Sequence, residues 1–227
     1  MNPFPDYKDV KVLHETAFTS ILKANSCESG KPVIIRAINR FTADEDEISR
    51  FRRELQTIAH LDLEGVLRPN DIEESDNYIY SVSDDFDARL LLTWMKRKPF
   101  ELQQVLTLGM QLIGIIGEIH AAQLVIGDLN PATILFNPET EEIKLTSLGI
   151  IGGEQLTNLP LTDSDFVSYS LPFIAPETTG RYFRDIDFYS DYYSFGAVLF
   201  FILTRRMPFL ESNPVRMINS ILAQTPK

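Results

Sequence analysis

Patterns typical of strands and of helices are segregated along this chain, and that segregation limits the possible folds most. Up to about Leu90 the pattern is mostly strands with one helix, and beyond Leu90 it is mainly helical. Strands followed by a run of helices predict an α+β architecture, in which sheet and helices form separate layers or lobes. With 227 residues, the chain is long enough for one large domain or two small lobes around a buried core.

In the first third, a β-branched run at residues 33–38 follows a turn at residues 29–32, which predicts a hairpin with an earlier strand at residues 19–24. Residues 78–83 form another expected strand. Between them, apolar residues recur at helical spacing after an acidic start that Thr42 or Asp44 can cap: Ile48, Phe51, Leu55, Ile58 and Leu61.

In the rest of the chain, residues 101–123 carry a broad apolar face and predict a buried helix. Two short strands are expected at residues 134–136 and 143–145, around a turn. Residues 149–170 are polar and predict a loop. Apolar residues 189–204 predict a second buried helix, and residues 213–223 predict a final amphipathic helix that Asn213 caps, with Pro214 in its first position.

Charge and cysteine content exclude several classes of function. The net charge of −11 argues against a nucleic-acid-binding surface and against docking on an anionic membrane. A single cysteine, Cys27, excludes an internal disulfide, and the three histidines lack metal-site spacing, so no metal site is expected. The N-terminus has no apolar signal region, and the apolar stretches read as too short to span a bilayer. We therefore expect a cytoplasmic protein without membrane insertion.

Several short sequence motifs occur together in a recognisable order, and the combination of motifs is far more specific than any single motif. The order of expected elements and motifs resembles the eukaryotic-type protein kinase fold over almost the whole chain. The first motifs are Val33-Ile34-Ile35-Arg36, where the family has Val-Ala-Ile-Lys; Glu54, at the position of the helix C glutamate; and Asp84-Asp85-Phe86, at the hinge. The later motifs are the catalytic-loop segment 127–135; Lys144-Leu145-Thr146-Ser147-Leu148-Gly149, which aligns with the strand leading into Asp-Phe-Gly; Ala175-Pro176-Glu177; and Asp191, in helix F.

The resemblance implies one bilobal domain over residues 1–227, with a small β-rich N-lobe (1–84) that holds one helix and a larger helical C-lobe (85–227). The closing C-lobe helices are not found before Lys227, so we expect an N-terminal fragment of a longer chain. Residues 176–181 and 185–187 resemble large bacterial signalling proteins, in which a kinase-like domain precedes an NTPase module and a sensor histidine kinase. The implied partners are other domains of the same polypeptide or two-component signalling proteins.

The positions where the family binds ATP and Mg²⁺ are substituted. Arg36 replaces the lysine that holds the α and β phosphates, and this exchange is not conservative at a tight site. Ser147 replaces the aspartate and Thr133 the asparagine that bind the metal, so both positions lack their usual ligand and Mg²⁺ is not expected. Three glycines that approach the phosphates are replaced by His14, Thr16 and Thr19.

The catalytic loop is partly retained. Asp128 stands at the position of the catalytic base, and Asn130 replaces the lysine that steadies the γ-phosphate. Ile126 and Gly127 replace the family's His-Arg. In such a loop we expect Asp128 to be a hydrogen-bond acceptor that stabilises the loop. Asp191 is expected to accept backbone N–H groups of this loop.

Three hypotheses follow. The first is a pseudokinase, a regulatory or interaction module with little or no phosphotransfer, in which Arg36 and Glu54 form a structural ion pair. The second is a divergent Ser/Thr kinase that transfers the γ-phosphate of ATP to protein Ser/Thr through Arg36, Glu54 and Asp128. The third is a nucleotide sensor that binds ATP without metal or turnover, with Arg36 on a phosphate and Asp84 to Phe86 on the adenine.

Overall fold

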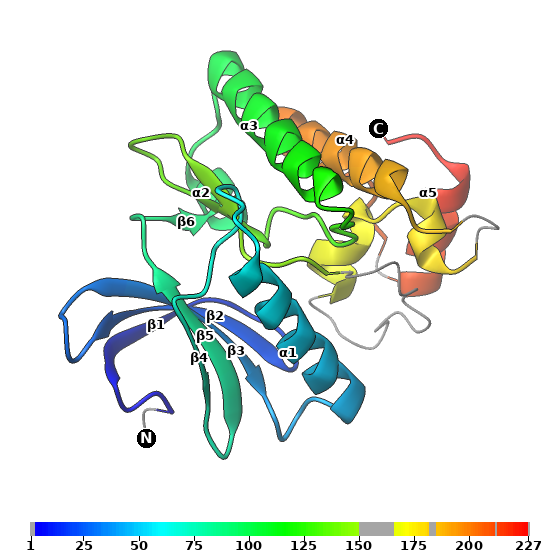
Figure 1. Cartoon of the computed structure of the whole chain (residues 1–227). Helices are drawn as coiled ribbons and strands as arrows, with labels where there is room; N and C mark the ends of the chain where they lie inside the picture. Colours follow the sequence, from blue (N-terminus) through cyan, green and yellow to red (C-terminus); the bar gives the residue numbers. More distant parts are fainter. Residues whose placement is uncertain (1–2, 150–165, 182–184, 212, 227) are drawn as a thin grey trace.

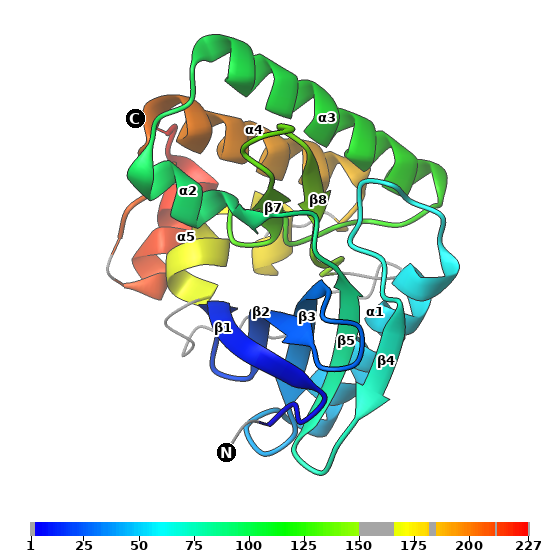
Figure 2. The same ribbon diagram turned by 90° about the vertical axis from the view of Figure 1, so that its left-hand side faces the viewer.

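The computed structural model describes residues 3–149, 166–181, 185–211 and 213–226. Strands fill its first part and helices most of the remainder, so the α+β architecture with a β-rich and a helical lobe is confirmed (Figure 1). In Figure 2, the sheet lies below the segment that enters the second lobe, and α3 and α4 lie on the opposite side of the molecule.

The first lobe is a five-stranded antiparallel sheet with the strand order β1-β2-β3-β5-β4. The predicted hairpin is its centre, because β-branched side chains suit a pleated surface that is covered on both faces. Its strands are β1 (Tyr7–Glu15), β2 (Thr19–Ser26), β3 (Pro32–Asn39), β4 (Asp71–Glu74) and β5 (Tyr78–Asp84).

One helix, α1 (Glu45–His60), packs on this sheet (Figure 1). Asp44 caps it: the Glu47 N–H donates to Asp44 Oδ1 at 2.7 Å, and the Asp44 N–H donates to Glu47 Oε2 at 2.8 Å. This reciprocal pair fixes where the helix begins. Its apolar face, which includes Phe51 and Leu55, contacts Ile38 and Ile79 of the sheet.

The second lobe contains a small sheet with the strand order β6-β7-β8 and the helices of the chain's remainder. Its elements are β6 (Arg89–Leu90), α2 (Leu91–Arg97), α3 (Leu102–Ala121), β7 (Ile134–Phe136), β8 (Ile143–Leu145), α4 (Phe188–Thr204) and α5 (Pro214–Ala223). The long helices α3 and α4 lie side by side in both views. Gly109 permits this approach, since a Cβ there would lie 3.3 Å from Leu199.

Two expectations need correction. Residues 150–165 of the expected loop lie outside the described residues, but Phe166–Ser170 forms one helical turn, and Leu171–Phe173 and Pro176–Thr179 form short 3₁₀ turns. These turns bury Leu171 and Phe173, which draws the chain into helical geometry.

The expectation that every apolar stretch is too short to span a bilayer is also corrected. By length and composition, helix α3 is long and apolar enough to cross a membrane. In this structure it packs in the core through Leu112 and Ile116.

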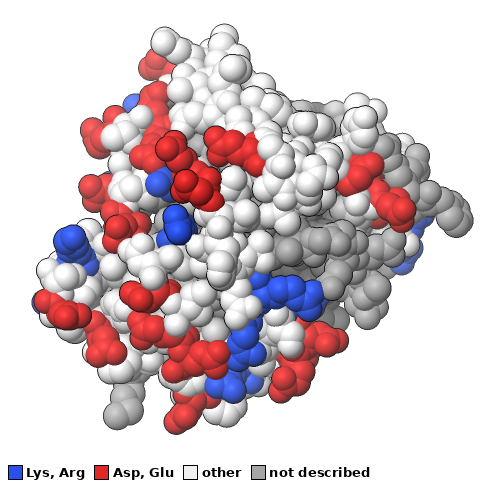
Figure 3. Space-filling view, in the orientation of Figure 1, with Lys and Arg blue, Asp and Glu red and all other residues white. Residues whose placement is uncertain are grey.

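Charge is unevenly distributed over the surface. In Figure 3, acidic side chains gather over the sheet lobe and beside the segment that links the lobes, whereas the area over α3 and α4 is largely uncharged. Leu102, Leu106 and Met110 of α3 are exposed large apolar side chains.

Candidate active site

The candidate site lies between the two lobes, and two of the connections that hold the lobes together involve the backbone. The first is the linking segment after β5, from Asp85 to Ala88. The second is the loop after α1: the Leu67 N–H donates to the Leu145 carbonyl, and the Leu145 N–H donates to the Gly65 carbonyl, both at 2.8 Å. The strand β8 is thereby attached to the sheet lobe, which brings residues 146–149 beside α1.

Arg36 and Glu54 form the expected ion pair. Nη1 and Nη2 of Arg36 donate to the two carboxylate oxygens of Glu54, each at 2.7 Å. The arginine side chain is 12% exposed and that of the glutamate 9%. Glu54 also accepts the Leu148 N–H at 2.7 Å, and the guanidinium lies 4.9 Å from the centre of the Phe51 ring. The pair therefore joins β3, α1 and the segment after β8, with both donor nitrogens of the arginine terminus engaged.

Asp128 is held by its neighbours as a loop acceptor. Asn130 Nδ2 donates to Asp128 Oδ1 at 2.8 Å, and Ser170 Oγ donates to Asp128 Oδ2 at 3.2 Å. Burial raises the pKa of the Asp128 carboxyl; the two hydrogen bonds oppose this shift, and the charge of Glu54 adds to it. Asn130 itself is buried, and its Oδ1 accepts the Ala132 N–H at 2.8 Å. Gly149 lies close by, since a Cβ there would come within 2.8 Å of Asp128 Cβ.

The two substituted metal positions do not fit a divalent cation. The Thr133 hydroxyl donates to the Asn130 carbonyl at 2.9 Å, so it serves the loop backbone. Ser147 is half-buried and offers a neutral hydroxyl, whereas Mg²⁺ prefers carboxylate oxygens. Within the described ranges, no group of three or more His, Cys, Asp or Glu side chains is placed to hold a metal ion.

Asp191, at the start of α4, is fully buried and organises the loop before Asp128. Its carboxylate accepts the Ile126 N–H at 2.9 Å and the Gly127 N–H at 2.8 Å, as expected from the sequence. Gly127 has a φ of 72°, a conformation that a glycine adopts without strain. His120 Nε2 lies 2.8 Å from the same carboxylate, and its ring stacks on Phe188 at 4.4 Å.

The turn between β1 and β2 is closed by hydrogen bonds among its own backbone and side-chain groups. The Thr16 N–H donates to the Thr19 carbonyl at 2.8 Å, and the Thr19 N–H donates to Thr16 Oγ1 at 3.0 Å. His14 packs edge-on against Tyr169, with ring centres 5.7 Å apart. The residues at the former glycine positions therefore make local contacts and reach the segment before Ala175.

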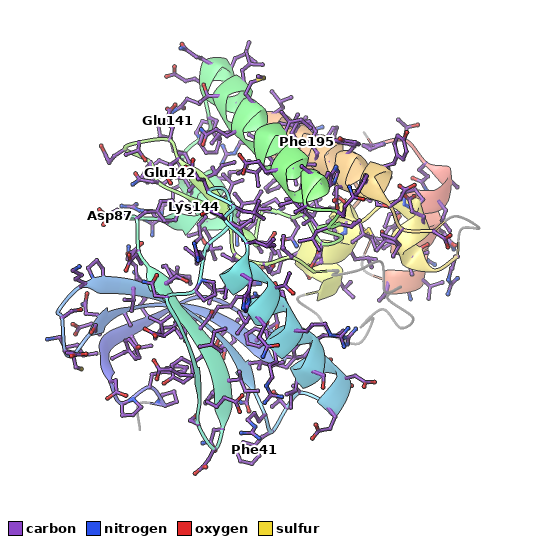
Figure 4. All side chains as sticks on the ribbon, in the orientation of Figure 1. Phe41, Asp87, Glu141, Glu142, Lys144 and Phe195 are labelled. Carbon is purple, nitrogen blue, oxygen red and sulfur yellow. The ribbon has the colours of Figure 1, made fainter. Side chains whose placement is uncertain are left out.

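The linking segment is also engaged. The Asp84 side chain is exposed and accepts from Asn70 Nδ2 at 2.9 Å, so it does not point into the site. The Phe86 carbonyl accepts from Asn137 Nδ2, and the Lys144 ammonium lies 5.2 Å from the Phe86 ring centre. In Figure 4, Asp87 of this segment and Lys144 of β8 lie on the same side of the molecule.

Sequence reasoning missed three groups that the structure brings to this site. Ser170 was expected only in a loop, and its hydroxyl contacts Asp128. The Leu148 N–H and the Asn137 amide carry no signal in the sequence, because each acquires its role from a long-range contact. Glu177 was recognised, and it accepts a 2.7 Å hydrogen bond from Ser190 Oγ.

Comparison with known proteins agrees with this geometry. The family described as Protein kinase domain matches residues 7–227. The chain is 27% identical to the serine/threonine-protein kinase PrkC of Bacillus subtilis over 223 residues, which is 97% of this chain and 34% of PrkC. It is 29% identical to PknA of Mycobacterium tuberculosis over 187 residues, or 79% of this chain and 42% of PknA.

The chain therefore spans well under half the length of these two relatives. The crystal structure of Rad53 1-466 in complex with AMP-PNP aligns with a TM-score of 0.70 at 21% identity, over 96% of this chain and 54% of that one, which shows the shared fold. With nearly its whole length matched, the chain belongs to the protein kinase domain family.

Proposed function

We propose that this protein kinase domain is a pseudokinase, which acts through protein contacts with little or no phosphotransfer. The observation that carries the proposal is the state of the metal positions: Thr133 bonds to its own loop, and Ser147 offers one neutral oxygen. Phosphoryl transfer relies on positioning and on metal ions that neutralise the developing charge. Without ligands for those ions, phosphoryl transfer does not proceed, and the retained Asp128 does not act as its catalytic base.

The ion pair supports the same proposal. Arg36 gives both terminal nitrogens to Glu54, and the pair links three elements. An arginine so engaged has both terminal nitrogens occupied by Glu54 and presents neither to a phosphate. The bacterial signalling context implied by the sequence extends the proposal to the partners, namely other domains of the same polypeptide or two-component proteins.

A phosphotransfer assay tests this function. The purified chain is incubated with radiolabelled ATP, with Mg²⁺ or Mn²⁺, and with casein as a generic acceptor. We expect no label on the chain or on casein above that of an Asp128→Ala control. Metal-dependent labelling that the Asp128→Ala substitution abolishes would contradict the proposal.

A divergent active Ser/Thr kinase is the second candidate. It is favoured by the relatives, which are named serine/threonine-protein kinases, and by the retention of Asp128 at the position of the catalytic base. The same assay separates the two candidates. Activity in Mn²⁺ but not in Mg²⁺ would indicate unconventional metal handling and would favour the kinase.

A further inference from the structure

The inner face of the sheet lobe carries branched apolar side chains where it meets the second lobe. Side chains alternate between the two faces of a strand, so Ile34 lies on the face of β3 that also holds Arg36. Ile35 lies on the other face, in a separate cluster with Leu22 and Tyr80. Ile21 of β2 lies in the same cluster as Ile34, and this cluster faces the second lobe.

The second lobe supplies the opposite wall. Leu90 of β6 and Leu135 of β7 pack in one cluster with Ile21 and Ile34, and Leu13 and Phe86 pack against its edge. Ile34 and Leu135 are 0% exposed, Leu90 is 2% exposed and Ile21 is 7% exposed. This cluster, the interlobe seam, therefore joins strands of both lobes through buried apolar side chains.

A nucleobase needs room that the seam does not leave. A flat ring stacked between apolar walls holds them about 7 Å apart, because carbon atoms contact at about 3.5–4.0 Å. Walls separated in that way contact water when the ring is absent, whereas the side chains of both walls here lie in one cluster and are almost fully buried. Ile34 stands where the resembled motif Val-Ala-Ile-Lys has alanine, and it adds three carbon atoms to the inner face.

The rim of the seam is closed as well. Lys23, on the same face of β2 as Ile21, forms an ion pair of 2.6 Å with Asp85 of the linking segment. Asn137 binds the Phe86 carbonyl of that segment. These contacts connect β2 and the residue after β7 to the linking segment, and they occupy the Phe86 carbonyl.

We infer that the interlobe seam occupies the position of the nucleobase and that Ile34 is the residue that excludes it. The inference deepens the proposed function: the domain holds its two lobes together through its own side chains in place of a purine nucleotide. It also distinguishes the pseudokinase from the metal-independent nucleotide sensor.

Calorimetric titration with ATP, with and without Mg²⁺, tests the inference on three proteins: the unmodified chain, Ile34→Ala and Ile35→Ala. The two variants remove the same side-chain volume from fully buried positions of β3, one on each face. We expect saturable binding of ATP only to Ile34→Ala, with affinity at least about tenfold above that of the other two proteins. Ile35→Ala controls for loosening of the sheet.

Saturable binding to the unmodified chain would overturn the inference, as would a folded Ile34→Ala that binds no better than Ile35→Ala. If Ile34→Ala does not fold, as judged by circular dichroism, Ile34→Val and Leu135→Ala open the seam by smaller steps or from the other wall and carry the same expectation. Binding without phosphotransfer in the unmodified chain defeats this inference alone, whereas metal-dependent phosphotransfer defeats the proposed function.

Discussion

Glu54 connects three parts of the molecule through one carboxylate. It accepts two hydrogen bonds from Arg36 of β3 and one from the Leu148 backbone. A buried ion pair of this kind is weak support for net stability, but removal of one partner leaves an uncompensated buried charge. The contribution of the Arg36–Glu54 pair to the fold is therefore measured by substituting one of its two residues at a time.

The Glu54→Ala substitution is expected to lower the free energy of unfolding by about 3–5 kcal/mol, because Arg36 loses its counter-charge in a buried site. The matched control is Glu74→Ala, which breaks the exposed pair with Arg52 and is expected to lower it by about 0–1 kcal/mol. Urea unfolding monitored by circular dichroism measures both. Similar effects of the two substitutions would show that the Arg36–Glu54 pair is not a structural link.

Asp128 makes stability depend on pH. Burial raises the pKa of its carboxyl in the folded chain above the unfolded value, so folding favours the protonated form. Its contribution to stability is full below the unfolded pKa and is lost as the pH rises through the folded pKa. Asp128→Asn is therefore expected to stabilise the chain at pH 7, with a benefit that shrinks toward pH 4. Paired urea titrations at the two pH values test this, and destabilisation at pH 7 would contradict it.

At the scale of elements, the predictable parts are those whose residues determine their own conformation. The short strands β7 and β8 begin and end where the sequence places them, and α5 is capped by Asn213, whose Oδ1 accepts from Val215 and Arg216. The strand β4 was missed, because its residues Asp71–Glu74 are mostly acidic and exposed, and only pairing with β5 makes them a strand.

The candidate site also has parts that the sequence predicts and parts that it does not. The Arg36–Glu54 pair and the role of Asp191 follow from motifs that align with those of the kinase family. The Asp128–Ser170 contact and the interlobe seam do not, since each joins residues that only the tertiary fold brings together. Ile34 was visible in the sequence as a departure from alanine, but its consequence depends on Leu135, a hundred residues away in another lobe.

The cap of α1 gives an element-scale prediction. Asp44→Ala removes the acceptor for the Glu47 N–H and is expected to lower the free energy of unfolding by about 1 kcal/mol. Asp76→Ala, an exposed acid in the turn before β5, is the control and is expected to stay within about 0.5 kcal/mol of the unmodified chain. Equal effects, read from urea midpoints, would show that the cap does not stabilise α1.

At the scale of the whole molecule, the lobes meet through the interlobe seam while the surface carries a net charge of −11. Self-repulsion among acidic groups opposes the compact state, and dissolved salt screens it. Raising NaCl from about 20 to 300 mM is therefore expected to raise the Tm. Differential scanning calorimetry measures this, and a Tm that falls with salt would mean that attractive surface pairs outweigh the repulsion.

If this kinase domain keeps its fold without a nucleotide, ATP does not change the thermal unfolding of the unmodified chain. A ligand at about 100 times its Kd stabilises the folded state by about 2.7 kcal/mol. For a domain of this size, that corresponds to a Tm rise of roughly 5–11 °C. We predict no rise with millimolar ATP, whether or not Mg²⁺ is present. A rise of that size, with or without Mg²⁺, would show that the folded domain binds ATP and would contradict this prediction.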